Sequence, residues 1–284
     1  IDTAPIYGLG HSEEVVGKAI AGQRDKYVIS TKATFDWDTG EGRFWHEVDG
    51  HKVYVAHGYK DIIKDCENSL KRLGTDYIDI YYTHNPVRDP AWLEKYPVED
   101  TVRALMDLKK AGKIRCIGSS NVDPEHIEAY MACGCEIDII QRKYTILARG
   151  VEENILPICE KYGMTFHAYA PIERGLLTGT VTKDRVVPPG DAREDQAWWA
   201  PDKLPHAIDF VDGLKDICEE YHCTQTDLAI AFIRHNRPYV NVIYGARKIK
   251  HLEAGAATVN VTLRDDTVAE IRRRAEELEA KYGG

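Results

Sequence analysis

The feature that most constrains the fold is a regular alternation of strand-like and helix-like segments along almost the whole chain. Short runs rich in β-branched and aromatic residues predict six strands: Tyr27–Lys32, Tyr77–His84, Ile114–Gly118, Ile137–Gln141, Met164–Tyr169 and Val240–Tyr244. Segments with helical spacing of apolar residues predict helices at residues 12–22, 57–73, 98–111, from 123, 151–162, 206–222, 225–235, 248–257 and 265–281. This alternation is typical of βαβ units and a parallel sheet.

Helix boundaries are marked by capping residues. Ser12, followed by two glutamates, is expected to open the first helix, because an oxygen and negative charge suit its free N–H groups. Asp123 followed by Pro124 predicts an N-cap and first helical residue, and Thr224 predicts another N-cap. Gly74 is expected to end the helix over residues 57–73.

Two parallel architectures compete, the open doubly wound sheet and the closed eight-stranded barrel. A doubly wound dinucleotide-binding domain carries a glycine-rich fingerprint after its first strand, and the nearest match, GLGHSE at residues 8–13, has glutamate in place of the third glycine. A barrel places its chemistry at the carboxyl ends of the strands. Seven polar residues lie at such ends: Asp2, Lys32, His84, Ser120, Asn121, Gln141 and Tyr169.

We therefore expect an α/β fold, a (β/α)8 TIM barrel, with residues 1–284 forming one domain. Only six strands and a stub at residues 1–3 are visible, and the sequence opens on Ile1. We expect that a first strand–helix unit of roughly 30 residues precedes position 1 in the natural protein.

Composition and charge narrow the class of protein. The formal net charge of −9 argues against a nucleic-acid partner, since such proteins usually present a basic surface. The chain contains no run of 18 apolar residues, so no membrane span is expected. Seven cysteines without a C-x-x-C pair indicate reduced thiols and a cytoplasmic location.

Four of the polar residues form a chemically informative set. Asp2 and Tyr7 lie in IDTAPIYG, Lys32 ends YVISTK, and His84 ends YIDIYYTH. A tyrosine in one pocket with a lysine, a carboxylate and a histidine can protonate a carbonyl oxygen, because a neighbouring cation makes a phenol a usable acid near neutral pH. Each residue alone also has an ordinary interpretation, such as rim packing, a solvated charge, a turn cap or a core histidine.

Four motifs in order resemble the aldo-keto reductase family: DTAPIYGLGHSE, GKIRCIGSSN at 112–121, QRKYTILAR at 141–149 and AYAPIERGLLTG at 168–179. The resemblance implies NAD(P)H-dependent reduction of an aldehyde or ketone to an alcohol, or the reverse. It implies that Tyr7 is the general acid and that Lys32 stabilises its phenolate. By the same resemblance Asp2 pairs with the lysine, and His84 orients the substrate oxygen.

The resemblance also implies a nicotinamide site. Ser120, Asn121 and Gln141 resemble the trio that binds the carboxamide, and Tyr169 resembles the aromatic residue that stacks on the nicotinamide ring. The segment at 243–256 resembles the one that binds the adenosine 2′-phosphate, and there Arg247, Lys248 and Lys250 form a basic cluster. This implies NADP, but His251, Ala254 and Gly255 stand where the family usually has Arg…Glu-Asn, so NAD remains possible. A solvated helix start is the ordinary alternative for the cluster.

Two long connections, residues 33–59 and 173–205, are expected to be loops. The aromatic residues of such loops are Trp37, Phe44, Trp45, Trp92, Trp198 and Trp199. They suit either a sugar- or polyol-like substrate site or packing of the loops, and the sequence does not decide between these. His46, His51 and His57 lack metal-ligand spacing, so no metal is expected.

The expected partner is therefore a small carbonyl or sugar-like substrate, and the oligomeric state is open. Two other functions remain compatible with the same fold. One is a regulatory subunit that senses the redox state with slow or no turnover, and the other is a sugar dehydrogenase working in the oxidative direction. Fold similarity alone does not separate them.

Overall fold

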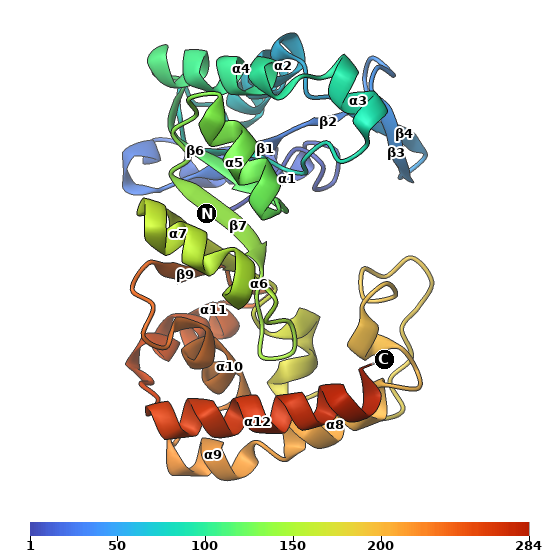
Figure 1. The fold of residues 1–284 in the computed structure, drawn as a ribbon, viewed down its shortest axis with the longest axis vertical. Coiled ribbons are helices and arrows are strands. Elements are labelled where there is room, and N and C mark those ends of the chain that lie inside the picture. Colours follow the sequence, from blue (N-terminus) through green and yellow to red (C-terminus); the bar gives the residue numbers. More distant parts are fainter. Residues whose placement is uncertain (284) are drawn as a thin grey trace. The chain divides into compact units, whose positions relative to one another are not determined.

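The computed structural model describes residues 1–283, which divide into two compact units. The first unit contains Ile1–Gln141 and Pro157–Thr165. The second contains Arg142–Leu156 and the chain from Phe166 onward. Figure 1 labels most of the helices and strands of both units.

The first unit is built on parallel strands hydrogen-bonded in the order β1 (Ser30–Ala33), β5 (Ile78–Thr83), β6 (Ile114–Ser120) and β7 (Ile139–Lys143). The register aligns Lys32 with Tyr82 and Tyr82 with Gly118. Two residues further along β6, Ser120 aligns with Gln141. Residues 2 and 30 form an isolated parallel bridge beside β1. The register therefore brings the predicted site residues of separate strands to one edge of the sheet.

The helices of the first unit are α1 (His11–Ile20), α2 (Tyr59–Leu73), α3 (Pro90–Lys95), α4 (Val98–Lys110), α5 (Pro124–Ala132) and most of α7 (Leu156–Tyr162), with a 3-10 turn η1 (Arg24–Lys26). Helix α2 packs against α1 and α4 (Figure 1). Its buried apolar side chains, Ile62, Cys66, Leu70 and Leu73, follow helical spacing. The predicted stop is confirmed, because Gly74 adopts a left-handed φ of 64° directly after Leu73.

The predicted start of the first helix is wrong in its cap. Gly10, with a left-handed φ of 96°, is the N-cap of α1, and Ser12 lies inside the helix. The Ser12 hydroxyl is instead 2.8 Å from the Thr3 hydroxyl. A Cβ at Gly10 would lie 2.7 Å from Cδ of Arg72, so the turn needs glycine for space as well as for conformation.

The prediction of a loop over residues 33–59 is also wrong. Strands β2 (Phe35–Asp36), β3 (Arg43–Val48) and β4 (His51–Val55) form an antiparallel sheet in the order β2-β4-β3. Most side chains of β3 are exposed, so it lacks the alternating pattern by which a half-buried strand is recognised. The signal that could have revealed it is Asp49-Gly50, because both residues have positive φ in the tight turn between β3 and β4.

The second unit contains the parallel pair β8 (Thr165–Tyr169) and β9 (Val240–Val242), whose register aligns Phe166 with Val240. Its helices are α6 (Val151–Asn154), α8 (Leu204–Asp212), α9 (Lys215–Glu220), α10 (Gln225–Arg234), α11 (Ile249–Ala257) and α12 (Asp265–Tyr282), with 3-10 turns η2 (Glu173–Thr178), η3 (Ala197–Trp199) and η4 (Thr258–Asn260). The cap at Thr224 is confirmed by reciprocal bonds with Asp227. The single helices predicted over 151–162 and 206–222 are each two helices, α6 with α7 and α8 with α9.

Two further features bear on the class of protein. All seven cysteines are free thiols, and four of them are buried. Within residues 1–283, no helix combines the length and the apolar character needed to cross a membrane.

Candidate functional site

The site in the first unit begins with a buried ion pair. Lys32, with 1% of its side chain exposed, donates from Nζ to Oδ1 of Asp2 at 2.7 Å and to the carbonyl oxygen of Thr3 at 2.8 Å. The other carboxylate oxygen of Asp2 accepts a bond of 2.7 Å from the Ser30 hydroxyl. These acceptors compensate a buried cationic group, which would be costly if it were left unpaired.

Tyr7 lies beside this ammonium. The loop that carries it folds back through bonds from the Tyr7 N–H to Ala4 O at 3.1 Å and from the Gly10 N–H to Pro5 O at 2.6 Å. Lys32 Nζ lies 5.1 Å from the centre of the Tyr7 ring. Tyr7 is 45% exposed, so a small molecule can reach a phenol that adjoins a buried cation.

His84 completes the group at the end of β5. Its ring lies edge-on to Tyr7, with 6.1 Å between the ring centres. Burial, with a further contribution from the charge of Lys32, lowers the pKa of His84 well below its ordinary value. The imidazole is therefore neutral, and a neutral ring has one N–H to donate. Its Nδ1 atom is buried and has no hydrogen-bond partner among residues 1–283.

Ser120, Asn121 and Gln141 lie next to this group. Gln141 donates from Nε2 to Oδ2 of Asp2 at 2.9 Å. Asn121 has a left-handed φ of 58° and donates from Nδ2 to the carbonyl oxygen of His84 at 2.9 Å. Its own N–H bonds the Gln141 carbonyl oxygen at 3.1 Å. The structure thus brings together all seven predicted site residues of the first unit.

The remaining predicted residues, Tyr169, Arg247 and Lys248, belong to the second unit. Tyr169 ends β8, and its carbonyl oxygen accepts from the Tyr144 N–H at 3.4 Å. Arg247 and Lys248 are exposed, and Lys248 is the N-cap residue of α11. The segment between β9 and these residues is held to β8 by a hydrogen bond of 2.8 Å from the Ile243 N–H to Ala168 O.

One supporting residue was missed by sequence reasoning. The sequence predicts Glu13 only as a favourable charge in the first turn of a helix, but its side chain is fully buried. It accepts from the Thr31 hydroxyl at 2.5 Å and from Nε of Arg72 at 2.6 Å. This carboxylate ties the helix that follows Tyr7 to the strand that carries Lys32. No local pattern reveals it, because its partners are 18 and 59 residues away.

The tryptophans were compatible with either a substrate site or packing of the loops, and the structure separates them. Trp198 and Trp199 are buried, and the Trp199 indole donates to the carbonyl oxygen of Glu173 at 3.0 Å, so they pack their loop. Trp92 stacks on Tyr96. Trp45 remains 42% exposed. Trp37 packs against the small core of Phe35, Val53 and Val55. Packing therefore accounts for four of the five tryptophans, while Trp45 leaves much of its side chain in solvent.

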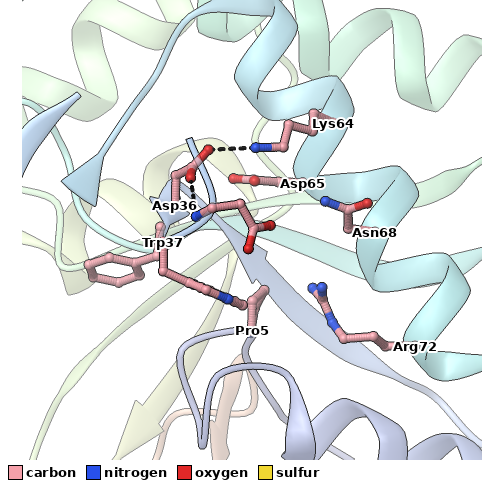
Figure 2. A pocket seen from close by; sticks show the side chains of 9 residues that line it. Pro5, Asp36, Trp37, Lys64, Asp65, Asn68 and Arg72 are labelled. Carbon is pink, nitrogen blue, oxygen red and sulfur yellow. Dashed lines mark hydrogen bonds and ion pairs between the residues drawn. The ribbon is translucent and has the colours of Figure 1, made fainter. Parts of the chain in front are cut away.

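A polar pocket adjoins the site. Figure 2 shows Lys64, Asp65, Asn68 and Arg72 projecting from α2 toward Asp36 and Trp37. Lys64 pairs with Asp36 at 2.6 Å. Burial raises the pKa of Asp65 to about 8, although its carboxyl group accepts the Thr34 N–H at 2.8 Å.

Thr34 links this pocket to the site. It has a left-handed φ of 88°, an unfavourable conformation for a β-branched residue. It directly follows β1, which carries Lys32, and precedes Phe35, whose ring lies 5.0 Å from that of His84. Among residues 1–283, no group of three or more His, Cys, Asp or Glu side chains is arranged to hold a metal ion.

Comparisons with known proteins agree with this arrangement. The sequence model described as "Aldo/keto reductase family" matches residues 1–276. The chain is 38% identical over 280 residues to an NADH-specific methylglyoxal reductase of Escherichia coli (strain K12), covering 98% of this chain and 84% of the relative. It is 34% identical over 274 residues to the aldo-keto reductase YhdN of Bacillus subtilis (strain 168), covering 95% of this chain and 77% of that protein.

Solved structures give the same result. The glycerol dehydrogenase AKR11B4 of Gluconobacter oxydans has a TM-score of 0.85 at 28% identity, covering 99% of this chain and 81% of that one. An aldo-keto reductase of Klebsiella pneumoniae, solved with NADP and acetate, has a TM-score of 0.68 at 29% identity, covering 99% and 79%. The expected TIM-barrel fold class is thereby confirmed. The chain belongs to the aldo-keto reductase family.

Proposed function

We propose that the protein reduces an aldehyde or ketone to an alcohol with NADPH or NADH, and that Tyr7 is the general acid. The observation that carries this proposal is the position of the Tyr7 ring, 5.1 Å from the buried ammonium of Lys32. An ammonium held in that place favours the phenolate and so makes the phenol a better proton donor.

The roles of the residues follow from their contacts. Tyr7 donates its proton to the carbonyl oxygen, which gains negative charge as the carbonyl carbon is reduced. Lys32 stabilises the phenolate that remains, and Asp2 positions this lysine through an ion pair of 2.7 Å. The neutral imidazole of His84 donates a hydrogen bond to the same oxygen and holds it near Tyr7.

The donor set at the ends of β6 and β7 fits a nicotinamide carboxamide. A hydroxyl from Ser120 and amides from Asn121 and Gln141 together offer donors and acceptors for both ends of that group. A bound nicotinamide supplies the hydride, because no side chain can do so. The bond from Gln141 to Asp2 couples this part of the site to the Lys32 pair.

For the cofactor we propose NADP, with NAD as an alternative. Arg247 and Lys248 are exposed cations at the start of α11 and suit the 2′-phosphate of NADP. The relative from E. coli is named NADH-specific, while the K. pneumoniae structure was solved with NADP. Tyr169 is proposed to stack on the nicotinamide ring.

The test measures oxidation of NADPH and of NADH in the presence of propanal, for the wild type and for Tyr7→Phe. We expect turnover by the wild type, a loss of at least about 100-fold in kcat for the variant, and unchanged cofactor binding. Tyr162→Phe is a matched control, because Tyr162 is 44% exposed and has Lys161 Nζ 4.6 Å from its ring centre. Equal activity of wild type and Tyr7→Phe would remove Tyr7 from the mechanism.

A second candidate is oxidation of a polyol or sugar. It is favoured by the TM-score of 0.85 with a protein named a glycerol dehydrogenase. Reduction of NADP or NAD by glycerol and by free sugars would identify it. A regulatory subunit without catalysis would bind the cofactor and turn over neither class of substrate.

A further inference from the structure

Several helices of this chain end in a motif that brings two side chains together. In this Schellman motif a residue just past the helix has a positive φ, and the next N–H bonds the carbonyl oxygen five residues before it. The side chains at the two ends of that bond are frequently in contact. The motif ends α2, α4, α5, α7 and α9 with the pairs Leu70/Thr75, Leu108/Lys113, Tyr130/Cys135, Cys159/Met164 and Cys218/Cys223.

At the end of α9 both members of the pair are cysteines. The Cys223 N–H bonds the Cys218 carbonyl oxygen at 3.0 Å. With standard bond lengths, such a bond holds the two Cα atoms no more than about 7 Å apart, which is the outer limit for a disulfide. The side chains also meet, because the Cys218 thiol donates a hydrogen bond to the Cys223 sulfur. The pair therefore meets the distance requirement of a disulfide without a rearrangement of the backbone.

The other four motifs show what packing alone requires. Each brings at most one cysteine to the contact, and each has glycine at the residue with positive φ. At α9 that residue is His222, with a φ of 49°. A residue with a Cβ is less favourable in this conformation than glycine is. The turn after α9 therefore lacks the glycine that favours the other four turns, and a covalent bond across it would compensate.

The two thiols differ in their access to solvent. Cys218 is buried, whereas Cys223 is partly exposed. Burial raises the pKa of both thiols, that of Cys218 to about 12, and the hydrogen bond from Cys218 offsets part of the rise at Cys223. Cys223 is therefore both the sulfur that a dissolved oxidant reaches and the thiol that more readily forms the attacking thiolate.

We propose that Cys218 and Cys223 form a thiol–disulfide exchange site for a small dissolved disulfide such as oxidised glutathione. The Cys223 thiolate attacks one sulfur of this molecule, whose S–S bond breaks and releases one glutathione. The Cys218 thiolate then attacks the Cys223 sulfur of the mixed disulfide and releases the second glutathione. Two protein thiols are thus oxidised to one disulfide, and the two glutathione thiols that leave take up the two protons.

The new bond would fix the corner between two helices of the second unit. Cys218 lies in the last turn of α9, and Cys223 directly precedes Thr224, the N-cap of α10 (Figure 1). Helix α10 in turn packs against β9 and η2. The exchange site is independent of the proposed carbonyl reduction.

The experiment incubates the folded wild type with oxidised glutathione at mildly alkaline pH, blocks the remaining thiols and digests the protein without reductant. A protease specific for glutamate cuts after Glu219 and Glu220, between the two cysteines. Mass spectrometry therefore finds the Cys218 and Cys223 fragments joined only if a disulfide links them. We expect joined fragments that carry no glutathione and that separate when dithiothreitol is added.

Cys218→Ser is expected to trap the intermediate, so that Cys223 retains one glutathione. Cys159 is an internal control, because the same motif pairs it with Met164, and it should remain a free thiol. Thermal unfolding under reducing conditions shows whether the variant is folded, and Cys218→Ala replaces it if it is not. An unmodified Cys223 in the wild type, a glutathione that stays on Cys223, or a bond from Cys223 to any other cysteine would overturn the inference.

Discussion

Lys32 and Asp2 form an ion pair of 2.7 Å in which the lysine side chain is almost completely excluded from solvent. The pair joins β1 to the first residues of the chain and holds the ammonium beside Tyr7. Removing only one partner leaves a buried charge without compensation, whereas removing both does not.

Asp2→Asn is therefore expected to lower the free energy of unfolding by about 3 kcal/mol, because the Lys32 charge loses its carboxylate. The double variant Asp2→Asn/Lys32→Met should recover most of that stability and still lack carbonyl reduction. Denaturant unfolding and NADPH oxidation measure the two effects separately. A double variant that regains activity would show that the ammonium is dispensable.

Gly118 is expected to tolerate no side chain. A Cβ at this position would overlap the ring of Tyr82, which is fully buried on the neighbouring strand. Gly118→Ala should therefore cost about 1–3 kcal/mol by overpacking. Gly150→Ala is the control, since a Cβ there meets nothing within 4 Å. Thermal unfolding of the two variants gives the comparison, and equal melting temperatures would contradict the packing argument.

Arg247→Ala is expected to raise KM for NADPH more than for NADH, because only NADPH carries the 2′-phosphate proposed to bind there. Loss of one charge-assisted hydrogen bond corresponds to roughly a 10-fold effect. Initial-rate kinetics with both cofactors and one aldehyde provide the measurement. Arg193→Ala is a control in the same unit, since Arg193 pairs with Asp191 in a separate loop. A similar rise in KM for both cofactors would mean that Arg247 does not bind the 2′-phosphate.

Much of the fold could be predicted from the sequence because its signals are local. Gly74 ends α2 and Thr224 caps α10 where the chain itself carries the reason, a left-handed residue or a side-chain acceptor. The β2-β4-β3 sheet was missed because β3 has no buried face. The N-cap of α1 is Gly10 and not Ser12, and the turn at Gly10 lies against Arg72, a contact between residues far apart in sequence.

The same limit applies to the site. Lys32 and His84 could be placed at strand ends because parallel strands end at a common edge. The contacts from Glu13 to Arg72 and from Phe35 to Trp45 could not be predicted, since no spacing along the chain encodes a pairing between separate elements. Residues that support a site are therefore harder to find from sequence than residues that form it.

Asp65 gives a prediction for pH. Its pKa, raised by burial to about 8 in the folded chain, is near 3.9 in an unfolded one, so the folded state holds a proton that the unfolded state loses between these values. The free energy of unfolding should therefore fall across that window as pH rises. The variant Asp65→Asn removes only this titrating group and retains its charged neighbours Asp36, Asp61 and Lys64. This variant keeps an acceptor for the Thr34 N–H, and its melting temperature relative to wild type should increase from pH 5 to pH 8.

Asp36→Asn is the contrasting control: burial would raise the pKa of Asp36, but hydrogen bonds led by that from Lys64 hold it below its usual value. Its loss should therefore destabilise the protein at neutral pH and matter less only below about pH 4. A difference between Asp65→Asn and wild type that is constant with pH would show that the Asp65 carboxyl group titrates normally.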